Sequence, residues 1–97
     1  MAETADERAF EIIEVEQAEE NLLKIIGLTL KTLKVGDRIN IHDDKNALVS
    51  NAAIFDVRRI FVFGRELSKV DRGFYIELFV SGNSGDLLRD AKYLYLK

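Results

Sequence analysis

The feature that most constrains the fold of this chain is a repeated alternation of apolar and polar residues with a period of two. In residues 74–80 the apolar residues Phe74, Ile76, Leu78 and Val80 fall on one parity. Residues 35–42 alternate in the same way, ending Arg-Ile-Asn-Ile-His. Because successive side chains of a strand point to opposite faces, this period indicates strands with one buried face.

Two further segments carry β signals in which the parity changes partway. Residues 53–63 are rich in β-branched and aromatic residues, which favour strands. Their apolar positions change parity at Arg58–Arg59, and residues 9–15 do the same at Ile12–Ile13. A β-bulge at each point would return the apolar residues to one face.

Residues 22–31 and 93–96 complete the set of predicted strands. In the first segment Leu22, Ile26, Leu28 and Leu30 share one parity, and in the second Tyr93 and Tyr95 share one. Residues 8–26 also admit a helix, because Glu, Gln and Ala are good helix formers. Their apolar residues form no clean helical stripe, so we favour a strand and keep the helix as an alternative. A short helical turn is expected at residues 86–89.

Turn residues separate these segments at short intervals. Gly-Asp at residues 36–37 precedes one strand, an Asp-Asp-Lys-Asn cluster at 43–46 follows it, and Gly64, Gly73 and residues 81–85 bound the others. We predict an all-β fold, a small closed six-stranded β-barrel. Its strands lie near residues 8–16, 22–31, 37–42, 52–63, 74–80 and 92–96. With 97 residues, we expect one domain over residues 8–97 and an acidic disordered tail at 1–7.

Composition excludes several kinds of site. The chain has no cysteine, which excludes disulfides, thiolate metal sites and a cysteine nucleophile. The acidic start lacks the basic and apolar regions of a signal peptide. The longest uncharged apolar run, residues 25–30, is far below the roughly 20 residues of a membrane helix. We therefore expect a cytoplasmic protein without a membrane partner.

Charge is unevenly distributed along the chain. Residues 1–21 carry eight acids and one base, for a net charge of −7, whereas residues 22–97 carry thirteen bases and nine acids, for +4. Five bases gather in residues 56–72 beside Phe61 and Phe63. The candidate binding residues are Arg58, Arg59, Arg65, Lys69 and Arg72. Cations beside aromatic rings can contact phosphates and stack on bases. Ordinary surface charge, with both phenylalanines in the core, is the favoured interpretation of this stretch, and a binding surface is the functional alternative.

Catalytic and metal-binding groups are sparse. His42 precedes Asp43 and Asp44, but neighbouring residues of a strand face opposite sides, and the chain has no second histidine. A turn is the favoured interpretation. A histidine–serine pair would require a contact that the sequence does not show. We predict no enzyme activity, no catalytic or metal site and no cofactor.

Several segments resemble a known barrel. Residues 33–41, Leu-Lys-Val-Gly-Asp-Arg-Ile-Asn-Ile, resemble a strand entry of the domain II β-barrel of translational GTPases such as elongation factor Tu. Residues 56–63, 73–82 and 86–90 resemble later segments of the same barrel, so the resemblance spans about residues 8–97. It implies the barrel fold, and a setting near RNA or the ribosome.

The resemblance does not extend to the family's nucleotide and aminoacyl-tRNA sites. No Gly-x-x-x-x-Gly-Lys-Ser/Thr loop is present, and Lys45-Asn46 is in the wrong order for guanine recognition, so we expect no nucleotide binding. Phe61 and Gly64 stand where the family has a Glu and an Arg that contact aminoacylated tRNA.

From the residues and the resemblance together we predict a stand-alone, non-catalytic binding module. Its expected partner is RNA or a ribosomal particle, contacted through the candidate binding residues. The alternative is a protein–protein adaptor that uses the acidic strip at residues 1–21.

Overall fold

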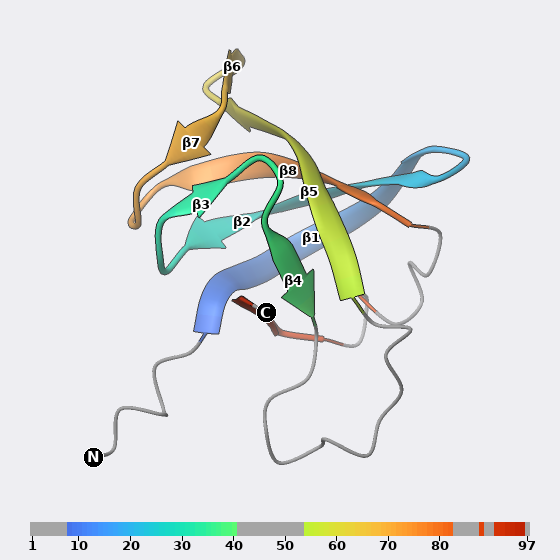
Figure 1. Ribbon diagram of the computed structural model, residues 1–97, viewed down its shortest axis with the longest axis horizontal. Coiled ribbons are helices and arrows are strands. Elements are labelled where there is room, and N and C mark those ends of the chain that lie inside the picture. Colours follow the sequence, from blue (N-terminus) through green and yellow to red (C-terminus); the bar gives the residue numbers. More distant parts are fainter. Residues whose placement is uncertain (1–7, 41–53, 83–87, 89–90, 97) are drawn as a thin grey trace.

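The chain folds into a closed antiparallel β-barrel, which confirms the predicted fold class (Figure 1). The computed structural model describes residues 8–40, 54–82, 88 and 91–96. The barrel strands, in spatial order, are β1 (Arg8–Glu19), β2 (Leu22–Thr29), β8 (Tyr75–Ser81), β5 (Ile54–Val62), β4 (Arg38–Asn40) and β9 (Tyr93–Leu96). Each strand pairs antiparallel with the next, and β9 pairs with β1, which closes the ring. Residues 8–19 are therefore strand, and the helical alternative for this segment is wrong.

Three short strands that the sequence did not predict lie beside the barrel. They are β3 (Leu33–Lys34), β6 (Arg65–Leu67) and β7 (Lys69–Val70). Strand β6 continues from β5 as a hairpin, while β3 and β7 form a separate two-stranded sheet. Figure 1 shows β6 at the top of the view, with β7 and then β3 below it, and we call the side that carries these strands the projecting side.

Both predicted β-bulges are present. The register of β1 against β2 shifts between Ile12 and Glu14, and Ile13 is 59% exposed. The register of β5 against β8 shifts between Val57 and Arg59. Consequently Arg58 and Arg59 are both exposed, although they are neighbours in one strand.

The core is formed by the inward-facing residues of the barrel strands. In β8 these are the predicted Ile76, Leu78 and Val80, all buried. In β2 the buried parity is the one that includes Leu23 and Ile25, and the parity shared by Leu22, Ile26, Leu28 and Leu30 is only partly buried. The apolar pattern of β2 did not identify the buried face because Gly27 and Thr29 also lie on that face.

Gly27 occupies an inward position of β2 because the barrel leaves no room for a side chain there. A Cβ atom at this position would clash with the carbonyl oxygen of Glu11 and lie 2.7 Å from the ring of Phe10. Phe10 is fully buried. The missing side chain therefore lets a large ring fill the barrel beside β2.

The hairpin between β5 and β6 turns within two residues, Phe63 and Gly64. Val62 pairs with Arg65, and the φ angles of the two turn residues are 52° and 80°. Two positive φ values define a type I′ turn, which matches the twist of the flanking strands. A bulky residue rarely adopts positive φ, and Phe63 is also 88% exposed.

Some predicted features lie outside the described residues. These are the tail at 1–7, the turn at 43–46 and most of the expected helical turn at 86–89. Leu88 is the part of that turn which is described, and it is helical and fully buried. In the described part of the chain, no helix has the length and apolar character needed to cross a membrane.

Replacing Gly27 tests the close approach of β1 and β2. We expect Gly27→Ala to lower the free energy of unfolding by about 1–3 kcal/mol, because the added methyl group overpacks the site against backbone. Urea denaturation measures the change. The exposed control Ser68→Ala should stay within about 0.5 kcal/mol of the parent. A Gly27→Ala protein as stable as the parent would contradict the tight packing.

Replacing Phe63 tests the strain in the turn. Asn-Gly is the preferred type I′ pair, so Phe63→Asn should raise the free energy of unfolding by about 1 kcal/mol. The exposed ring contributes little burial to offset this gain. The same denaturation experiment measures it, and a destabilised Phe63→Asn protein would show that the ring itself stabilises the fold.

Candidate functional site

The five candidate binding residues are all exposed, but they do not share one face. Arg58 and Arg59 lie at the bulge of β5. Arg65 begins β6, Lys69 begins β7, and Arg72 lies in the turn before β8. The first two thus lie on a barrel strand, and the other three lie on the short strands β6 and β7 or in the turn that follows them.

Arg59 is already engaged by a carboxylate. Its Nε and Nη2 atoms donate hydrogen bonds of 3.0 Å each to the two carboxylate oxygens of Glu66, across the β5–β6 hairpin. These hydrogen bonds raise the pKa of Arg59 and lower the pKa of Glu66, and the attraction of the two charges adds to both effects. The guanidinium also lies 5.1 Å from the ring centre of Phe61. Arg59 is therefore less available to an external anion than its sequence position indicated.

Arg58 lies beside the acidic end of the β1–β2 hairpin. One depression is lined by Glu19, Glu20, Asn21, Leu22, Arg58, Arg59 and Ser81. The acidic strip and the first two arginines, separate in the sequence, thus meet at this depression. Carboxylates this close reduce the positive potential that Arg58 and Arg59 can present.

The other three cations have no such partner. Within the described part of the chain, Arg65, Lys69 and Arg72 form no ion pair, whereas three other cations do. The paired cations are Lys24 with Glu77, Arg38 with Asp56, and Arg59 with Glu66. These three cations are therefore not held in direct ion pairs with described residues.

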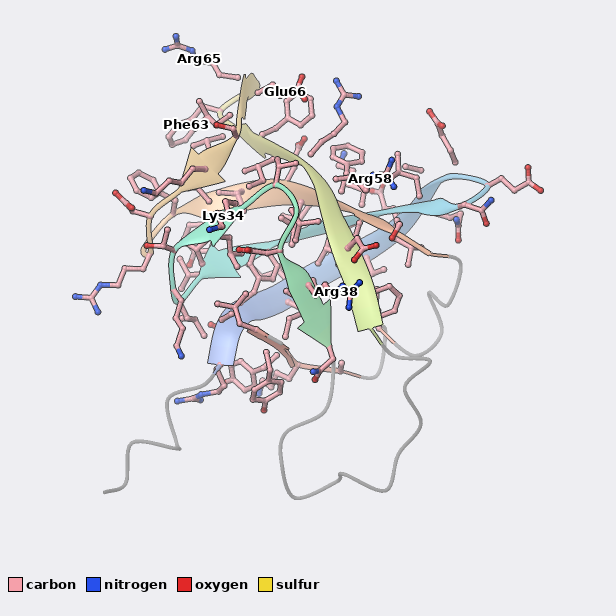
Figure 2. The ribbon with its side chains drawn as sticks, viewed as in Figure 1. Lys34, Arg38, Arg58, Phe63, Arg65 and Glu66 are labelled. Atoms are coloured by element: carbon pink, nitrogen blue, oxygen red, sulfur yellow. The ribbon has the colours of Figure 1, made fainter. Side chains whose placement is uncertain are left out.

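Lys34 joins this group through the β3–β7 sheet. Leu33 and Val70 pair and are buried, which turns the next pair, Lys34 and Lys69, outward on one face. Two like charges directly opposite each other are unfavourable unless an anion lies between them. We call Lys34, Arg65, Lys69 and Arg72 the cationic flank. Figure 2 shows Lys34 on β3 and Arg65 extending outward beyond the β5–β6 hairpin.

A tight turn holds β3, and with it Lys34, against the barrel. Gly36 has a φ of 100°, and the side chain of Asp37 accepts a 2.9 Å hydrogen bond from the backbone N–H of Lys34. Gly36 N–H donates to the carbonyl of Val57, and Val57 N–H donates to that of Asp37, both at 2.9 Å. The Gly-Asp motif found in the sequence therefore fixes β3 to β5.

A buried threonine fixes the turn that carries Arg72. Thr29 is 1% exposed, and its Oγ1 donates to the carbonyl of Asp71 and accepts from Phe74 N–H, both at 2.9 Å. Its own carbonyl accepts a 2.8 Å hydrogen bond from Gly73 N–H. The last residue of β2 thus holds both ends of the turn and sets the position of Arg72.

An exposed aromatic group was missed in the sequence. The expectation that Phe61 and Phe63 both belong to the core is wrong for Phe63, and Phe61 is only partly buried. A shallow depression is lined by Ile26, Phe61, Phe63, Gly64, Tyr75, Ile76 and Glu77. Phe61 meets Phe79 edge to face at 5.5 Å. The exposure of Phe63 could have been predicted from its place before Gly64 in a two-residue turn. The flanking strands β5 and β6 cannot bury the tip of the hairpin that they form.

The remaining chemical candidates gain no support. His42, Asp43 and Asp44 lie outside the described residues, so the structure tests neither the turn nor a histidine–serine pair. In residues 8–40, 54–82, 88 and 91–96, no group of three or more His, Cys, Asp or Glu side chains is placed to hold a metal ion. The sites that the described structure shows are charged and aromatic surfaces.

Comparison with known proteins shows the fold. No protein-family model matches the sequence, and no curated protein matches it. Among solved structures, a bacterial selenocysteine-specific elongation factor, EF-Sec, matches with a TM-score of 0.67 and 16% identity, over 95% of this chain and 15% of that one. The C-terminal domain of a putative U32 peptidase from Geobacillus thermoleovorans matches with a TM-score of 0.58 and 11% identity, over 100% and 98% of the two chains. The chain thus spans a small part of the elongation factor and the full length of the peptidase domain. The resemblance to an elongation-factor barrel is confirmed at the level of the fold.

Proposed function

We propose that this barrel is a non-catalytic binding module that contacts RNA, free or within a ribonucleoprotein, through the cationic flank. The observation that carries the proposal is that Lys34, Arg65, Lys69 and Arg72 are exposed and form no ion pair with a described residue, and that Lys34 and Lys69 lie opposite each other. Phosphates of a nucleic acid backbone are the partners that such exposed lysines and arginines bind most generally. The shared fold with an elongation factor supports the proposal by analogy.

The placement of the lysines favours an extended anion. Lys34 and Lys69 lie directly opposite each other, and Arg72 follows Lys69 by three residues, a chain distance of at most about 10 Å. A backbone with regularly spaced phosphates can contact several of these cations together. A single carboxylate could neutralise only one or two of them.

Arg58 and Arg59 belong to the margin of the proposed interface. Arg58 is exposed and forms no ion pair with a described residue, but Glu19 and Glu20 share its depression. Arg59 would have to leave Glu66 to meet a phosphate. We therefore expect the larger share of RNA affinity from the cationic flank and a smaller share from this pair.

Removal of the flank charges tests the proposal. We expect the triple variant Arg65→Ala, Lys69→Ala and Arg72→Ala to bind a labelled single-stranded RNA at least about tenfold more weakly at low salt. The slope of log affinity against log salt should flatten by about 0.7 for each lost phosphate contact. Fluorescence anisotropy over a sodium chloride series measures both quantities, and circular dichroism checks that the fold is kept.

A charge-matched control separates the flank from net charge. The triple variant Lys24→Ala, Arg38→Ala and Lys92→Ala removes the same number of positive charges elsewhere. It should retain most of the affinity of the parent. Equal losses in both variants would show a general field effect. A parent protein that binds no RNA at low salt would overturn the proposal and favour an adaptor that uses the acidic strip at residues 1–21.

A further inference from the structure

Three cations converge on one open depression at the end of the barrel where β1 begins and β2 ends. The depression, of about 550 Å³, is lined by Arg8, Leu30, Lys31, Thr32 and Arg72. Among the described residues that line it there is no acidic side chain, and the one side-chain hydroxyl belongs to Thr32. Arg8 and Lys31 were not among the predicted binding residues, and only Arg72 belongs to the cationic flank.

Each of the three cations comes from a separate chain segment that is held in place. The guanidinium of Arg8 lies 4.8 Å from the ring centre of Tyr93 on the neighbouring strand β9. The backbone N–H groups of Leu30 and Lys31 both donate to the carbonyl of Ala9, at 2.8 and 3.3 Å. These bonds fix the chain after β2 against the start of β1.

Arg72 contributes to the depression from the turn before β8. Its turn is held by Thr29, whose hydroxyl and carbonyl bond both ends of the turn. Neither Lys31 nor Arg72 forms an ion pair with a described residue. The acid next to Arg72, Asp71, directs a carboxylate oxygen toward Thr32 Oγ1 at 3.5 Å. The depression is therefore cationic, with one carboxylate close to its border.

We propose that this depression binds a dianionic phosphate group, supplied by free phosphate or by a small phosphomonoester. Guanidinium groups form paired hydrogen bonds with phosphate oxygens, and a lysine adds a compact charge. A phosphomonoester carries between one and two negative charges at neutral pH and has three terminal oxygens. Three cations from three chain segments suit it better than they suit a phosphodiester, which has one charge. This site goes beyond the proposed RNA contact and does not depend on it.

Titration with phosphate, observed by amide chemical shifts, tests the site. Inorganic phosphate should produce saturable shifts of the Lys31, Thr32 and Arg72 amides with a dissociation constant near 1 mM, the weak affinity expected of an open site. Glycerol 3-phosphate should produce the same shifts if the source is a phosphomonoester. Dimethyl phosphate, with a single charge, should bind at least about tenfold more weakly.

Variants of neighbouring lysines give a matched control. Lys31→Ala should weaken phosphate binding about tenfold, as expected from the loss of one charge-assisted hydrogen bond, while Lys34→Ala should not. Asp71→Asn should strengthen binding severalfold, because it removes the carboxylate at the border. RNA affinity, measured separately, should respond to Arg65→Ala and Lys69→Ala rather than to Lys31→Ala, so the two proposals can fail independently.

Three outcomes would overturn the site. The first is the absence of saturable shifts at these amides up to about 20 mM phosphate, well above the expected dissociation constant. The second is equal affinity in Lys31→Ala and Lys34→Ala. The third is equal binding of dimethyl phosphate and glycerol 3-phosphate, which would show that the depression does not select a dianion.

Discussion

Closure of the barrel depends on β4, a strand of three residues that pairs on both sides. Ile39 lies opposite Phe55 of β5 and opposite Leu96 of β9, and all but the last of these side chains are buried. Without β4 the sheet would leave an edge open on β5 and another on β9, and open strand edges pair readily with other chains. The turn before β4 is bonded to Val57, and the β5 bulge begins at the same residue. The closure of the barrel and the outward placement of Arg58 and Arg59 thus share one anchor.

The sequence predicted most of the fold, because period-two alternation is a local signal. It also located the bulges at Ile12–Ile13 and at Arg58–Arg59, since an apolar pattern that changes parity needs an extra residue to stay on one face. It did not identify the buried face of β2. Gly27 is required there by the ring of Phe10, which is distant in sequence, and Thr29 is buried because its hydroxyl is fully bonded to another turn.

The candidate site was less predictable than the fold. Arg65, Lys69 and Arg72 were identified from local charge, but the pairing of Lys34 with Lys69 joins residues 35 positions apart and has no local signal. Arg58 and Arg59 differ from the other three because Glu66 binds Arg59. In addition, Glu19 and Glu20, at the end of the β1–β2 hairpin, line the same depression as both arginines. Charge counts along a chain do not show which acids fold against which bases. Among the described residues, Arg59 is ion-paired and Arg58 lies beside acids, whereas the cationic flank forms no ion pair.

The bonds of Thr29 have a consequence for the thermodynamics of binding at the nearby surface. A loop that must be ordered by its ligand loses conformational freedom at the moment of binding, and this loss subtracts from affinity. The turn of Arg72 is instead ordered when the chain folds, because the buried hydroxyl, the carbonyl and the N–H of Thr29 all bond to it. Its backbone therefore enters any complex already arranged, and only side-chain rotamers remain to be fixed. A small barrel can in this way present a defined surface from a turn, the kind of element that is otherwise the most mobile part of a protein.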